Sequence, residues 1–187
     1  MSADSKFQFS KITVSLHWIV AILMIALLAV GIYMTENHDY SLYPLHKSFG
    51  VVVLVFAFAR AVWRVKNGWP VPAGDYKAWE HMLAGVIHWV LILGTLILPV
   101  SGIIMSSMGG HNVPFFGFDL IPANHDPVNP QDVLPRNEGL SEAAGEVHEI
   151  VGYLLIAAII LHVAGALKHH IIDKDGTLQR MRGKNIG

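Results

Sequence analysis

Four histidines lie near the ends of long apolar runs, and their type and spacing suit them to metal chemistry. His17 and His46 begin the first two runs, and His148 and His162 lie on the fourth. An ionisable ring inside a membrane segment is costly, so it usually marks a functional site and needs a partner. His148 and His162 are 14 residues apart, which places both rings on nearly one helix face, about 21 Å apart along the axis. Two ligands stacked along one helix in this way suggest two haem groups stacked across a bilayer.

The composition indicates an integral membrane protein. The 187 residues are 53% hydrophobic and only 14% charged, whereas soluble domains carry about 25% charged residues. We expect a single domain over residues 1–187, because the apolar residues are grouped in long runs along the whole chain. The absence of cysteine excludes disulfides, thiolate iron–sulfur clusters and haem attachment through a C-x-x-C-H motif. Any metal chemistry must therefore use imidazole, thioether or carboxylate ligands.

Four runs are long enough to cross the hydrocarbon layer of a membrane, which needs about 20 apolar residues. We expect an all-α, four-helix membrane bundle with spans at about residues 12–35, 45–64, 82–108 and 144–171. Pro99 lies inside the third run and should kink that helix. Residues 109–143 are rich in Pro, Asn, Asp and Gly, and we expect them to form a long outer loop that includes a short surface helix.

The basic residues predict the orientation of the bundle. Eleven of the 13 lysines and arginines precede the first run, join the second to the third, or follow the fourth; the exceptions are Lys47 and Arg136. By the positive-inside rule, both termini and the 64–80 loop are cytoplasmic. This topology pairs the histidines by depth, with His17 and His162 as an inner pair and His46 and His148 as an outer pair. Two imidazoles on opposite faces of one iron fill both axial positions, as in an electron carrier.

Small residues accompany these ligands at helical spacing. A flat macrocycle between helices needs such clearance, although glycines also let membrane helices pack closely. The glycines in question are Gly50, Gly145, Gly152 and Gly165. His88, in the inner half of the third run, is an alternative ligand for the inner site, or else a packing residue or a contact of a haem propionate.

Several motifs of the chain resemble those of the bacterial cytochrome b561 family. They are Leu16-His17-Trp18, His46-Lys47-Ser48-Phe49-Gly50, the histidines of the fourth run, His169-His170, and the tail Lys174-Asp175-Gly176-Thr177-Leu178-Gln179-Arg180-Met181. The resemblance covers nearly the whole chain except the outer loop. It implies a four-helix protein of the bacterial inner membrane that holds two haem b groups through ligands on the first, second and fourth spans.

The resemblance also implies an oxidoreductase. One characterised member of that family is a superoxide oxidase, which passes electrons from superoxide outside the membrane through both haems to ubiquinone. Its quinone site uses a basic residue before the first span and a histidine beyond the inner ligand, and the matching positions here are Lys11 and His169. His169, His170 or Asp173 would relay protons from the cytoplasm. The expected partners are a quinone, superoxide or another periplasmic redox donor, and the lipid bilayer, but no nucleic acid.

The charge of the outer segments leaves the electron donor open. They carry nine acidic residues against Lys47 and Arg136, so they would not steer an anion such as superoxide, although Lys47 gives a local positive charge. One alternative is a cytochrome b subunit that links a periplasmic dehydrogenase or hydrogenase to the quinone pool, but such relatives usually carry a fifth span. Another is a histidine-lined metal transporter, which would need its ligands near the middle of the membrane.

Overall fold

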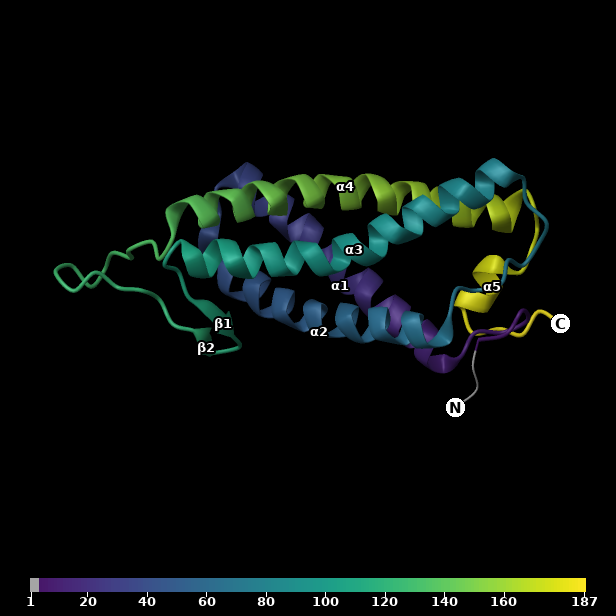
Figure 1. Ribbon diagram of the computed structural model, residues 1–187, viewed down its shortest axis with the longest axis horizontal. Coiled ribbons are helices and arrows are strands. Elements are labelled where there is room, and N and C mark those ends of the chain that lie inside the picture. The colour runs from purple at the N-terminus through teal and green to yellow at the C-terminus, as the bar shows by residue number, and fades with distance from the viewer. Residues whose placement is uncertain (1–3) are drawn as a thin grey trace.

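Four long helices make up most of the protein (Figure 1). The computed structural model describes residues 4–187, and its long helices are α1 (Lys11–Asn37), α2 (Tyr43–Asn67), α3 (Ala78–Met108) and α4 (Glu138–Ile171). A 3-10 turn, Tyr40–Leu42, joins α1 to α2, and a short helix, α5 (Thr177–Met181), follows α4. All four long helices are apolar enough to cross a membrane, with mean hydropathies of 1.8 to 2.4. The predicted four-helix membrane bundle is confirmed.

Each helix extends beyond the apolar run that predicted it, because polar residues continue the helix past the hydrocarbon layer. The difference is largest for α4, which begins at Glu138 rather than at residue 144. Asn137 caps this helix, since its side chain accepts a hydrogen bond from the backbone N–H of Leu140 at 3.0 Å. The predicted outer loop is therefore shorter than residues 109–143.

The prediction of a short surface helix in the outer loop is wrong. The segment instead forms an antiparallel hairpin of β1 (Val113–Phe115) and β2 (Phe118–Ile121), at the opposite end of the bundle from the termini (Figure 1). Its two central residues, Phe116 and Gly117, have φ of 46° and 107°. A two-residue hairpin loop of this kind requires positive φ, which glycine adopts without steric cost.

The apolar side chains of the bundle face outward as well as inward. A buried core joins all four helices through Met24, Leu27, Val53, Leu91, Leu98, Leu155 and Ala158. Large apolar residues also point away from the protein: Ile22, Phe58 and Ile160 are 62 to 63% exposed. A helix that is apolar on all sides suits a surrounding of lipid rather than water.

The chain ends close over one end of the bundle, where both termini lie (Figure 1). Asp4 pairs with Arg64 of α2 at 3.2 Å and accepts hydrogen bonds from Ser10 and Thr13. Burial opposes the ionisation of Asp4, but these hydrogen bonds outweigh burial and hold the pKa of the carboxyl below its usual value. Arg180 of α5 is buried beneath the same segment and donates hydrogen bonds to the backbone carbonyls of Lys6 and Val71.

Close packing of α3 on α4 depends on Gly94. A Cβ atom there would lie 2.7 Å from Cδ2 and 3.0 Å from Cγ of Leu155, whose side chain is fully buried in the core. Figure 1 shows α3 bending near its middle, as expected of a helix with Pro99 inside it. The shape of α3 thus combines a kink with a point of close helix contact.

We expect Gly94→Val to lower the stability of the folded bundle by about 1–3 kcal/mol, because the added methyl groups overpack the contact with Leu155. Thermal unfolding of the purified protein in detergent measures this. Gly85→Val on the same helix is the matched control, since a Cβ at Gly85 meets nothing within 4 Å. Equal unfolding temperatures for the two variants would show that the contact does not limit packing.

Candidate functional site

The structure brings the predicted outer histidine pair together. The rings of His46 on α2 and His148 on α4 have centroids 6.4 Å apart. Nδ1 of His148 lies 2.8 Å from the backbone carbonyl oxygen of Leu98 and 3.2 Å from Oγ of Ser101. Donation from Nδ1 to a carbonyl is how proteins fix the tautomer of a metal-binding histidine, and it leaves Nε2 free to bind a metal. Pro99, inside α3, directly follows Leu98, whose carbonyl accepts this bond.

The predicted inner pair is also together. The rings of His17 on α1 and His162 on α4 have centroids 6.1 Å apart. His88 on α3 lies still closer to His162, at 5.4 Å, and stacks against Trp69 at 6.2 Å. The inner level therefore contains three histidines, and the distances alone leave His88 as an alternative to His17.

Both pairs have the spacing that a haem iron requires. Bonds between a metal and an imidazole nitrogen are about 2 Å long, so two rings on opposite sides of one iron have centroids about 6 Å apart. The two observed separations match this value. His46 Nδ1 is buried without a hydrogen-bond partner among residues 4–187, so the protein alone leaves this ring nitrogen unsatisfied. The residues fit haem b.

A cavity of about 370 Å³ lies beside the outer pair. It is mostly apolar, and both histidines line it together with three of the predicted small residues, Gly50, Gly145 and Gly152. At Gly50 a Cβ atom would meet nothing within 4 Å, so the helix borders open space there. The fourth predicted glycine, Gly165, lies beyond the inner ligand on α4 and also borders open space. This clearance is what a flat macrocycle needs.

Two further glycines at the outer level were missed by the sequence analysis. A Cβ at Gly102 would lie 2.9 Å from Cε1 of His148, and one at Gly31 would lie 3.5 Å from Cε1 of His46. Gly31 follows His17 by 14 residues, and Gly102 follows His88 by 14 residues. The spacing that relates His148 to His162 thus recurs on other helices, and it is the signal that could have found these glycines.

The structure does not join the two predicted quinone residues. Lys11 is exposed at the first position of α1, and no hydrogen bond or ion pair links it to His169 within residues 4–187. His169 lies in the last turn of α4, with its ring 4.5 Å from that of Tyr76. The first turn of α1 and the last turn of α4 lie at the end of the bundle where the chain termini lie (Figure 1).

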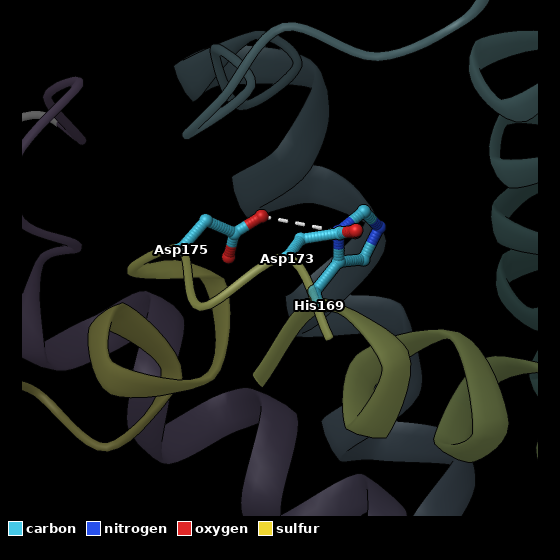
Figure 2. A group of neighbouring side chains, drawn as sticks. All are labelled: His169, Asp173 and Asp175. Atoms are coloured by element: carbon cyan, nitrogen blue, oxygen red, sulfur yellow. Dashed lines mark ion pairs between the residues drawn. The ribbon is translucent and has the colours of Figure 1, made fainter. Parts of the chain in front are cut away.

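His169 is instead surrounded by carboxylates (Figure 2). Its Nδ1 lies 2.9 Å from Asp173 and 3.1 Å from Asp175. The group has the residue types of a metal site, but its oxygens already have partners: Lys168 pairs with Asp173 at 2.8 Å, and the Tyr76 hydroxyl donates to Asp175. We interpret it as a polar network whose carboxylates have partners, whereas His169 Nδ1 is buried close to both and forms no hydrogen bond with residues 4–187.

Hydrogen bonding sets the ionisation of this network. Burial alone would raise the pKa of the Asp175 carboxyl, but hydrogen bonds from Tyr76 and Thr177 outweigh burial and hold that pKa below its ordinary value. Burial and the same bond to Asp175 raise the pKa of the Tyr76 phenol. At neutral pH the network therefore combines a carboxylate with a protonated phenol, next to an imidazole.

Comparison with known proteins agrees with this arrangement. The sequence profile of prokaryotic cytochrome b561 matches residues 8–184. Two relatives from Escherichia coli are cytochrome b561 homolog 1, 32% identical over 93% of this chain and 96% of its own, and cytochrome b561 homolog 2, 29% identical over 95% and 93%. The probable superoxide oxidase CybB of Yersinia pestis is 25% identical over 96% of this chain and 98% of its own. The family binds b-type haem, transfers electrons and lies in the bacterial inner membrane. The chain thus belongs to the prokaryotic cytochrome b561 family.

Proposed function

We propose that this protein carries electrons across the inner membrane through two haem b groups, from superoxide in the periplasm to ubiquinone. The observation that supports this most is the presence of two histidine pairs, 6.1 Å and 6.4 Å between ring centroids, at two levels of one bundle. When bound at these pairs, haem b supplies reversible one-electron chemistry. His17 and His162 hold the inner group, and His46 and His148 the outer one.

The protein's own residues fix these ligands in place. His148 is oriented by its hydrogen bond to the Leu98 carbonyl. Gly102 leaves space for the His148 ring, because a Cβ atom at position 102 would lie 2.9 Å from Cε1 of that ring. The two levels are about 21 Å apart along α4, since His148 and His162 are separated by 14 residues of helix. Two one-electron carriers at that separation bridge most of a hydrocarbon layer about 30 Å thick.

The basic residues support a cytoplasmic position for both chain termini. Transfer from periplasmic superoxide to a quinone at this end would therefore run inward. We assign the quinone to the inner end, with His169 hydrogen-bonded to its head group and Lys11 nearby. Quinone reduction also consumes protons. Asp173 and Asp175, both within about hydrogen-bond distance of His169 Nδ1, would return protons to this imidazole from the cytoplasm.

Superoxide is the donor that the Yersinia pestis relative's name supports. Lys47 is the local positive charge nearest the outer ligands; it follows His46 directly and donates a hydrogen bond to the Asn112 carbonyl at 3.1 Å. The second candidate is a cytochrome b subunit fed by a periplasmic protein. The exposed acidic residues of the outer loop favour it, because they present a negative surface to a basic redox partner. The metal transporter is disfavoured, because the rings form two separate pairs rather than one cluster at mid-membrane.

We expect alanine substitution to remove haem in pairs. His17→Ala and His162→Ala should each lose the same low-spin haem signal, and His46→Ala and His148→Ala should lose the other, because one imidazole alone leaves an axial position open. Electron paramagnetic resonance and optical spectra of the purified variants measure this. His170→Ala, on an exposed position of α4, is the control and should keep both signals. If His88→Ala and not His17→Ala removed the inner signal, the ligand would be reassigned.

His169→Ala should retain both haems and slow quinone reduction tenfold or more, since positioned proton donors typically contribute about 10²–10⁴ to a rate. The measurement is the rate of ubiquinone analogue reduction by the pre-reduced protein, with His125→Ala, at an exposed position of the outer loop, as the control. Unchanged turnover in His169→Ala would place the quinone elsewhere.

A further inference from the structure

Arg60 is a charged residue inside a membrane-spanning helix, and the part of the chain that the structure describes offers it no hydrogen-bond or ion-pair partner. It lies on α2 and is partly buried, and within residues 4–187 its guanidinium makes no hydrogen bond or ion pair. Arg64, one turn further along, has both: it pairs with Asp4 at 3.2 Å and donates to the Gly68 carbonyl at 2.7 Å. An unpaired cation at this depth is costly, so it calls for an anionic ligand.

The 14-residue spacing along the helices places Arg60 at the inner level. It follows His46 by 14 residues, as His162 follows His148 on α4. At this spacing α1 and α3 carry a histidine at the inner level and a glycine at the outer one. Arg60 is accordingly at the depth of His17, His88 and His162, on the face of α2 that carries His46. The outer level has Gly31 and Gly102 where the inner level has His17 and His88, and it has His46 where the inner level has Arg60.

We propose that Arg60 binds a propionate carboxylate of the haem held by His17 and His162; this rests on the di-haem function proposed above. Haem b carries two propionates, and a guanidinium binds a carboxylate through two parallel charge-assisted hydrogen bonds. The partner also removes the cost of the unpaired cation. A lipid phosphate offers the same anionic chemistry, so the experiment below separates the two sources.

The test is a haem titration of the full-length apoprotein in detergent, with haem b and with its dimethyl ester, which has no ionised propionate. The inner site is identified by the signal that His17→Ala lacks. In the wild type, esterification should weaken binding at the inner site about tenfold or more, the effect of losing a hydrogen bond to a charged group. Arg60→Gln should weaken binding of haem b by a similar factor and show little further loss with the ester.

Arg64→Gln is the matched control. Arg64 lies one helical turn from Arg60 and carries the same charge, but it is already paired with Asp4. The inner-site affinity of Arg64→Gln should stay within about twofold of the wild type, whereas Arg60→Lys should retain part of the affinity. Equal affinity of the wild type for haem b and its ester at the inner site would overturn the proposal, even if Arg60→Gln failed to fold, and would favour a lipid phosphate. If Arg60→Gln lowered the affinity for haem b and for its ester by the same factor, the proposal would also be overturned, and Arg60 would have a packing role alone. A wild type that binds no haem at the inner pair would instead contradict the proposed function.

Discussion

The structure depends on the cost of placing ionisable rings among apolar side chains. A histidine inside a bilayer-spanning helix must have a partner, and here the helical period provides one. Fourteen residues are almost four complete turns, so residues at that spacing lie on nearly one face at two depths. His148 and His162 use this spacing on α4, and neighbouring helices supply a facing ring at each depth. Two sites follow from one repeated spacing.

The two levels differ in the residues that complete them. At the outer level, Gly31 and Gly102 approach the rings of His46 and His148, and three more glycines border the cavity. The hairpin covers this level, since the backbone N–H of Phe116 donates to Ser48 Oγ at 3.2 Å. At the inner level His17 and His88 take the positions of Gly31 and Gly102, and Arg60 takes the position of His46. The fold thus makes one site from small residues beneath a strand pair, and the other from polar residues next to the end of the bundle where the chain termini lie.

Much of this arrangement could be predicted from the sequence. Runs without charge gave the four helices, and the basic residues and the histidine spacing gave the depth pairs that the structure brings together. The hairpin could not be predicted, because its strands are three and four residues long and depend on contacts with α2. The carboxylate network at His169 was missed in part, because Tyr76 is far away in sequence from its partner Asp175. Gly31, Gly102 and Arg60 were missed because the 14-residue spacing was applied only to α4.

The most direct measurement is a count of haem per chain by the pyridine haemochrome method, combined with a reduced-minus-oxidised spectrum of the wild-type protein purified from haem-replete cells. Two low-spin b-type haems per chain would agree with two bis-imidazole sites. One haem per chain, or none, would contradict the account, because at least one histidine pair would then remain in the membrane without an iron to bind.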